Sequence, residues 1–167
     1  MKQLHDALER GHVILDLDAT DIGTAVGKTV GHMVLDGIIP QQAAEQIVSA
    51  LLQREQAVPT AIGHATAIPH AYLDVIEEPI IVFVRLAHPV NLGAPDGIPT
   101  QFLFFLLGPP GSAERHLDTL ANVARLMSNE EFRYALRRAG NQDELLEALQ
   151  RFVDHAEFPT LAPTEAG

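Results

Sequence analysis

The sequence contains no cysteine, and this absence excludes several kinds of chemistry at once. A chain of 167 residues without cysteine forms no disulfide framework, binds no zinc through thiolates and has no thiol nucleophile. It also lacks any run of about 18 apolar residues, so no segment is predicted to cross a bilayer. The first residues, MKQLHDALERGH, contain no hydrophobic region of the signal-peptide kind. A cytoplasmic location is therefore expected.

Basic residues are scarce as well. The chain has 11 lysines and arginines against 22 aspartates and glutamates, which gives a formal net charge of -11. Such a balance excludes nucleic acid as a partner, because that partner requires a basic surface, and it disfavours an anionic membrane surface. The length is sufficient for one domain with a sizeable core. We expect that domain to cover residues 1–154 and a flexible tail to cover residues 155–167.

Segments with a helical spacing of apolar residues accompany short, dense apolar runs. Helices are predicted over 1–11, 18–37, 40–55, 112–127, 128–140 and 141–155, strands over 12–17, 79–86 and 100–108, and an irregular or extended stretch over 56–74. The runs PIIVFVRL and TQFLFFLLG are typical of interior strands that are covered on both faces. Helices around a compact sheet predict an α/β sandwich.

Two details of the predicted helices carry structural expectations. Gly23, Gly27 and Gly31 line one face of the helix over 18–37, and each costs about 1 kcal/mol relative to alanine. We therefore expect that face to pack closely against a neighbouring element. Ser112 precedes the helix over 112–127 and is expected to be its N-cap.

The stretch GHATAIPH carries the strongest chemical signal. Pro69 has a restricted φ and disfavours a helical conformation at Ile68, so His70 should project from a defined, extended backbone. Small neighbours leave space around the ring, and their amides could face an anion. A neutral imidazole is nucleophilic near neutral pH, which suits attack on phosphorus. Arg54 is a candidate to bind the phosphoryl oxygens.

These residues alone leave other interpretations open. His70 could be an ordinary histidine without a chemical role. His64, His70 and His116 could supply three nitrogen ligands to a metal, although no HExxH spacing is present. The sequence has no glycine motif for binding nucleotides. We therefore assign neither a metal nor a cofactor.

The segment LLQREQAVPTAIGHATAIPH resembles the region around the phosphorylated histidine in EIIA proteins of the fructose/mannitol type, from the bacterial phosphotransferase system. The nitrogen-regulatory members belong to the same group. Matching positions are Arg54, Glu55, Thr60, Ile62, Gly63, Ala67, Ile68, Pro69 and His70. The resemblance extends over about residues 12 to 152, and it implies an EIIA-type α/β sandwich with a small mixed sheet flanked by helices.

The resemblance also implies roles for particular residues. His70 would be the phosphoryl acceptor, His116 the second histidine of the site, and Arg54 a catalytic residue beside them. Thr60, Gly63 and His64 would support the phosphoryl group. The implied partners are HPr as donor and EIIB as acceptor, and whether such a carrier is an enzyme, a phosphotransferase, is left open.

The chain departs from the family pattern around the proposed acceptor. Ala61, Ala65 and Ala71 stand where the family usually has glycine, and Tyr72 replaces a small or basic residue. Each change adds atoms near the expected position of a phosphoryl group or of HPr. We expect these side chains to hinder phosphoryl exchange while leaving the acceptor in place.

The C-terminal half carries a second resemblance, over about residues 80 to 163. Its FVRL and FLFFLLGP runs are similar to the cytoplasmic domain of the anion-exchanger (band 3) and bicarbonate-transporter family. Our main hypothesis is therefore that the domain regulates an anion or bicarbonate transporter, with His70 as a switch. The alternatives are a phosphocarrier between HPr and EIIB, and a structural domain that is not phosphorylated. A homodimer is left open.

Overall fold

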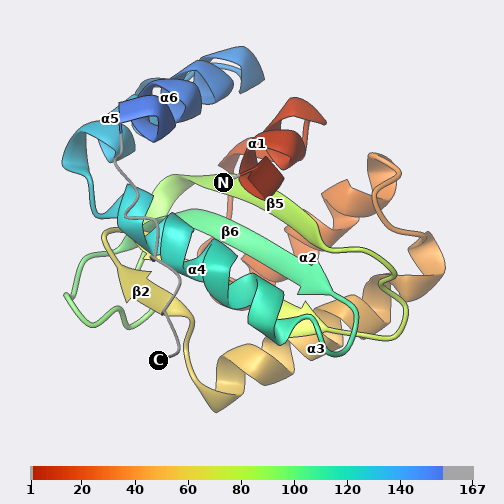
Figure 1. Cartoon of the computed structure of the whole chain (residues 1–167). Coiled ribbons are helices and arrows are strands. Elements are labelled where there is room, and N and C mark those ends of the chain that lie inside the picture. The colour runs from red at the N-terminus through yellow and green to blue at the C-terminus, as the bar shows by residue number, and fades with distance from the viewer. Residues whose placement is uncertain (1, 156–167) are drawn as a thin grey trace, which may run out of the picture.

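The computed structural model describes residues 2–155 and shows a mixed sheet between two layers of helices (Figure 1). The helices are α1 (Lys2–Glu9), α2 (Ile22–Leu35), the 3-10 helix η1 (Gln41–Ala43), α3 (Ala44–Ala57), α4 (Ala113–Met127), α5 (Glu130–Arg138) and α6 (Gln142–His155). The strands are β1 (Val13–Leu17), β2 (Ala61–Gly63), β3 (Thr66–Ala67), β4 (His70–Tyr72), β5 (Ile80–Val90) and β6 (Thr100–Gly108). No helix in this part of the chain has the length and apolar character needed to span a bilayer.

Strand β6 is the centre of the six-stranded sheet. It pairs antiparallel with β5 on one side, and parallel with β3 and then β4 on the other. The two ends of the sheet are β1, parallel to β5, and β2, antiparallel to β3. The short strands β2, β3 and β4 make up the stretch that was expected to be irregular or extended.

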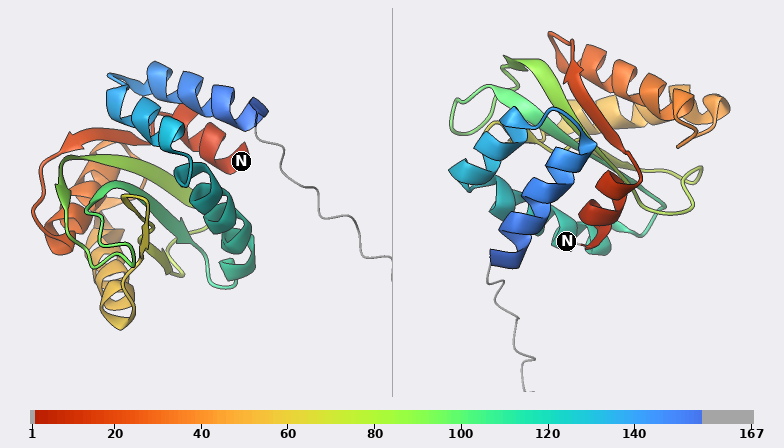
Figure 2. Two further views of the ribbon diagram at one scale, coloured as in Figure 1. Left: turned by 90° about the vertical axis from the view of Figure 1, so that its left-hand side faces the viewer. Right: turned by 90° about the horizontal axis from the view of Figure 1, so that it is seen from above.

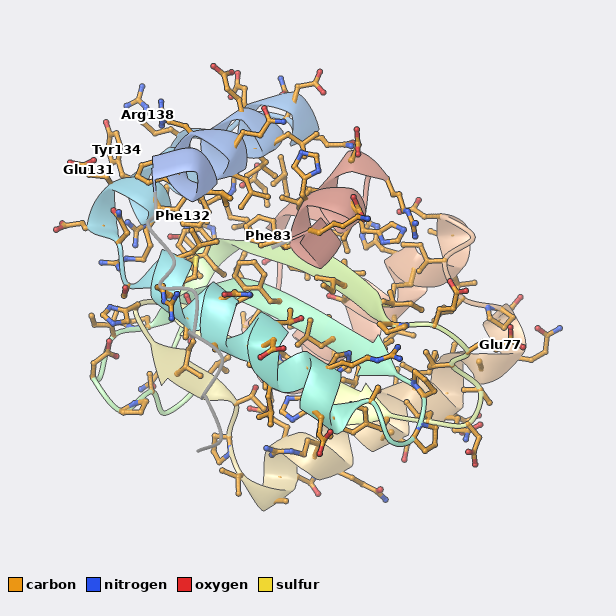
Figure 3. All side chains as sticks on the ribbon, viewed as in Figure 1. Glu77, Phe83, Glu131, Phe132, Tyr134 and Arg138 are labelled. Atoms are coloured by element: carbon orange, nitrogen blue, oxygen red, sulfur yellow. The ribbon has the colours of Figure 1, made fainter. Side chains whose placement is uncertain are left out.

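Each face of the sheet has its own hydrophobic core. Helices α2 and α3 cover one face, where Val26, Met33 and Ile47 are fully buried. Helices α1, α4, α5 and α6 cover the other face, as the two views of Figure 2 show. Phe83 of β5 and Phe132 of α5, labelled in Figure 3, both belong to the core on this face. The prediction that the two dense apolar runs are interior strands is confirmed, because both cores contain their side chains.

The expectation for the glycine-rich face of α2 is wrong. Gly27 and Gly31 are exposed, and an added Cβ at either position would meet nothing within 4 Å. These glycines therefore do not serve close packing in the described part of the chain. The apolar side chains of Val26, Val30 and Met33 form the buried face of α2, and these glycines lie outside it.

The predicted cap of α4 needs correction. Ser112 occupies the N-cap position of α4, but its side chain makes no capping hydrogen bond. Its hydroxyl donates instead to the carbonyl of Pro109, at 2.6 Å. Helix α6 ends at His155, where the predicted helix over 141–155 ends, and residues 156–167, the rest of the predicted tail, lie outside the described residues.

A buried arginine ties three elements together on the face covered by α5. Arg85 of β5 is 6% exposed and donates two hydrogen bonds from Nη2 to the carboxylate of Asp16 on β1, at 3.0 and 3.1 Å. Its Nη1 donates to the carbonyl of Leu136 at 3.0 Å and to that of Ala139. The guanidinium thus satisfies carbonyls at the end of α5 that would otherwise lack partners.

We expect Arg85→Met to lower the free energy of unfolding by about 2–3 kcal/mol, because a buried polar group left unpaired costs about 1–3 kcal/mol. Urea unfolding measures the change. Arg10→Met is the matched control at an exposed arginine and should change the value by less than about 0.5 kcal/mol. Equal stability of the Arg85 variant and the native protein would contradict a role for this contact.

Candidate functional site

His70 is the first residue of β4, and the backbone around it is held on both sides. It lies opposite Leu106 near the end of β6. The carbonyl of Pro69 accepts the amide of Leu106 at 2.9 Å, and the amide of Ile68 donates to the carbonyl of Thr60 at 3.1 Å. The side chain is half-buried. The extended segment predicted from Pro69 therefore presents this ring at the edge of the sheet.

The ring of His70 has a defined tautomer. Its Nδ1 lies 2.8 Å from the carbonyl oxygen of Ile68. A carbonyl oxygen only accepts hydrogen bonds, so Nδ1 carries the hydrogen and donates it. In the neutral ring, Nε2 then keeps its lone pair. Nε2, the ring nitrogen farther from the backbone, is therefore the one with a free lone pair.

Glu55 and Thr60 support this arrangement from the end of α3. The Glu55 carboxylate is buried and accepts the backbone N–H of Thr60 at 3.0 Å and its hydroxyl at 2.7 Å. The carbonyl of Thr60 in turn accepts the amide of Ile68, whose carbonyl accepts Nδ1 of His70. The hydroxyl hydrogen of Thr60 is thus directed to Glu55. Thr60 is linked to His70 only indirectly, through the backbone of Ile68.

His116 lies in the first turns of α4 and is buried, with 1% of its surface exposed. Its Nδ1 lies 3.2 Å from the hydroxyl oxygen of Tyr72. Its Nε2 is buried and has no hydrogen-bond partner among the described residues. Burial lowers the pKa of His116 below the ordinary 6.5, and the nearby His70 lowers it further. The neutral ring is therefore favoured.

Tyr72 connects the two histidines. Its ring centroid is 6.2 Å from that of His70 and 5.2 Å from that of His116. Burial raises the pKa of Tyr72 above 10.0, and the charge of Arg54 acts in the opposite direction. Sequence reasoning treated Tyr72 only as a departure from the family pattern. Its spacing of two residues from His70 on a strand was the signal that both side chains share a face.

Arg54 belongs to the same group of residues. It is half-buried in the last turn of α3, and its Nη1 donates to the carbonyl of Val58 at 2.8 Å. Its charge acts on Tyr72. The structure thus places both histidines around Tyr72, which is opposite Gly108 at the end of β6, and the charge of Arg54 acts to lower the pKa of this tyrosine. A Cβ at position 108 would lie 3.0 Å from Cε1 of His116 and 2.3 Å from the hydroxyl of Ser112, so this position requires glycine.

Gly63 and His64, which were expected to support the phosphoryl group, lie elsewhere. They form the turn before β3, where Thr66 is opposite Phe102. His70 is opposite Leu106, four residues further along β6, which is about 13 Å of strand. The amide of His64 donates to Asp96 at 2.8 Å. The structure therefore does not bring Gly63 and His64 to His70, nor does it assemble the three histidines considered as metal ligands.

Comparison with known proteins identifies the type of fold. The model of the family described as "Phosphoenolpyruvate-dependent sugar phosphotransferase system, EIIA 2" matches residues 6–152. A nitrogen regulatory protein of Bradyrhizobium diazoefficiens is 34% identical over 108 residues, which are 65% of this chain and 71% of that protein. The predicted resemblance to this family is confirmed.

Solved structures agree with the predicted fold. The nitrogen regulatory protein IIA-Ntr from Neisseria meningitidis superposes with a TM-score of 0.77 at 24% identity, covering 87% of this chain and 98% of that one. The IIA chain in a complex of mannitol enzyme IIA with phosphorylated enzyme IIB from Escherichia coli gives a TM-score of 0.67 at 19% identity, covering 84% and 94%. The EIIA-type sandwich is therefore the fold of this chain.

The resemblance to bicarbonate transporters is partial. An electrogenic sodium bicarbonate cotransporter from Ambystoma tigrinum is 39% identical over 84 residues, which are 49% of this chain but 8% of that protein. This match does not support transporter regulation as the main function. The phosphocarrier alternative fits the comparisons better, because the EIIA family covers nearly the whole described chain.

We expect His116 to titrate below pH 6.5 in an NMR titration of the folded protein. Because the folded state binds this proton less readily than the unfolded chain, His116 contributes stability that is present above its unfolded pKa and is lost as the pH falls. The native protein should therefore lose more stability between about pH 7.5 and about pH 5.5 than His116→Gln. Equal losses would contradict the shift.

Proposed function

Because the chain belongs to the EIIA 2 family of the phosphoenolpyruvate-dependent sugar phosphotransferase system, we propose that it carries a phosphoryl group on Nε2 of His70. The observation that carries this proposal is the 2.8 Å hydrogen bond from Nδ1 of His70 to the carbonyl of Ile68. It leaves Nε2 with the free lone pair that attack on phosphorus requires. We further propose that residues 1–154 act as a single domain.

The proposed transfer begins with phosphorylated HPr as donor. The lone pair on Nε2 forms a bond to phosphorus, while the bond from phosphorus to the donor atom breaks and its electron pair stays on that atom. Nδ1 keeps its hydrogen, so the phosphorylated ring carries a positive charge. The carbonyl of Ile68 stabilises that charge through a charge-assisted hydrogen bond.

The same hydrogen bond suits the onward step. A ring that keeps its hydrogen on Nδ1 leaves phosphorus as a neutral imidazole, which is a better leaving group than an imidazolate. The acceptor's lone pair would form the new bond to phosphorus as the bond to Nε2 breaks. We propose an EIIB protein as this acceptor, and the structural likeness to the IIA chain of the mannitol IIA–IIB complex supports that class of partner.

The site also contains groups that can balance the negative charge of the phosphoryl oxygens. Arg54 is the nearby cation, and its charge already reaches Tyr72. His116 remains neutral at ordinary pH because its pKa is lowered. We assign to Arg54 the binding of phosphoryl oxygens, and to Glu55 and Thr60 the positioning of Ile68.

Incubation with phosphoenolpyruvate, enzyme I and HPr should add one phosphoryl group to the native protein, as measured by intact mass. His70→Ala should take up none, because it lacks the acceptor nitrogen. His64→Ala is the matched control, since His64 precedes β3, which pairs with β6 about four residues away from the place where His70 pairs with it. This variant should be labelled like the native protein.

Persistent labelling of His70→Ala would assign the acceptor to another residue. Loss of labelling in His64→Ala, with the fold intact by circular dichroism, would contradict the separation of the two histidines. Failure of the native protein to accept a phosphoryl group would overturn the proposed function itself.

A further inference from the structure

Tyr72 lies between two histidines whose hydrogen positions can be worked out. It follows His70 by two residues on β4, so both side chains lie on the same face of the strand. Its ring also pairs with that of His116, at a centroid distance of 5.2 Å and an interplanar angle of 32°. The hydroxyl oxygen lies 3.2 Å from Nδ1 of His116. Tyr72 is thus in contact with the buried histidine and adjacent to the proposed acceptor.

The buried environment of His116 indicates which atom carries the hydrogen. Its Nε2 has no hydrogen-bond partner in the described part of the chain. If Nε2 carried the hydrogen, a buried N–H donor would be left without an acceptor, which is rarer and more costly than an unpaired acceptor. The hydrogen is therefore on Nδ1, and Nδ1 donates to the oxygen of Tyr72.

This assignment leaves the hydroxyl hydrogen of Tyr72 available. A phenol oxygen accepts one hydrogen bond while its own O–H donates another. Since His116 donates to the oxygen, Tyr72 must donate to a group other than His116. In the described residues, the hydroxyl has no recorded hydrogen bond except the one with His116. The hydroxyl is thus a donor held in orientation by a buried ring.

We propose that Tyr72 is a catalytic residue that donates its hydroxyl hydrogen to a phosphoryl oxygen on Nε2 of His70, with His116 as the residue that positions it. This inference rests on the proposed phosphorylation of His70. The hydroxyl makes no covalent bond, and its hydrogen stays on oxygen throughout the transfer. The charge of Arg54 near the phenol strengthens it as a donor.

The proposal reverses the role expected for Tyr72 from the sequence. A side chain that seemed to obstruct the site instead covers His116 and supplies the group that faces the phosphoryl oxygens. Burial raises the pKa of Tyr72, so the phenol keeps its hydrogen at neutral pH. His116, at 1% exposure, positions Tyr72 through the bond between its Nδ1 and the hydroxyl oxygen.

Tyr72→Phe tests the proposal because it removes the hydroxyl and keeps the ring. With phosphorylated HPr as donor, we expect the transfer rate at saturating donor to fall about 10- to 100-fold, since one lost donor to a transition-state oxyanion costs about that much or more. The KM for HPr should change little. Tyr134→Phe is the matched control at the only other tyrosine, which is exposed and bonded to Arg138, and it should retain the native rate.

A second measurement separates a chemical role from a structural one. In protein labelled with 3-fluorotyrosine, the fluorine signal of Tyr72 should shift when His70 is phosphorylated, and the signal of Tyr134 should not. Suppose that the native protein is labelled. An unchanged transfer rate in Tyr72→Phe, or an unchanged fluorine signal of Tyr72, would then overturn this inference alone. No labelling of the native protein would overturn the proposed function and this inference together.

Discussion

The hydrogen bond from Nδ1 of His70 to the carbonyl of Ile68 is the contact on which the chemistry of this site depends. It places the hydrogen on one ring nitrogen and leaves the other as a nucleophile. The bond is local, but its geometry is set by a longer chain of contacts. The buried carboxylate of Glu55 holds Thr60, and Thr60 holds the amide of Ile68. Glu55 of α3 therefore positions His70, the proposed acceptor, through the backbone of Thr60 and Ile68.

The arrangement of His116 and Tyr72 depends on the burial of the His116 ring. His116 lies under Tyr72 because Gly108 at the end of β6 leaves room for its ring beside the sheet. The same burial keeps this histidine neutral and leaves one of its nitrogens unpaired. Burial raises the pKa of Tyr72 as well, and the charge of Arg54 in α3 acts in the opposite direction. The half-buried His70, our proposed nucleophile, thus lies beside the half-buried Tyr72 and the buried His116, an arrangement suited to binding charged oxygens at the surface.

Much of this could be predicted from the sequence, for identifiable reasons. His70, Pro69 and Arg54 lie within one short segment, where proline chemistry and the family resemblance apply directly. The two dense apolar runs specify buried strands by composition alone. The contact between Tyr72 and His116 could not be predicted, because the two residues are 44 positions apart. The distance between His64 and His70 depends on strand register, which the sequence pattern does not show.

The most direct test of this account is nitrogen-15 and phosphorus-31 NMR of the phosphorylated protein labelled at histidine. The account predicts a phosphorus–nitrogen coupling to Nε2 of His70 and a hydrogen on Nδ1, as the bond to Ile68 requires. In the unphosphorylated protein, the same ring should show a hydrogen on Nδ1 and an unprotonated Nε2. A coupling to Nδ1, or a ring that carries its hydrogen on Nε2 before phosphorylation, would contradict it.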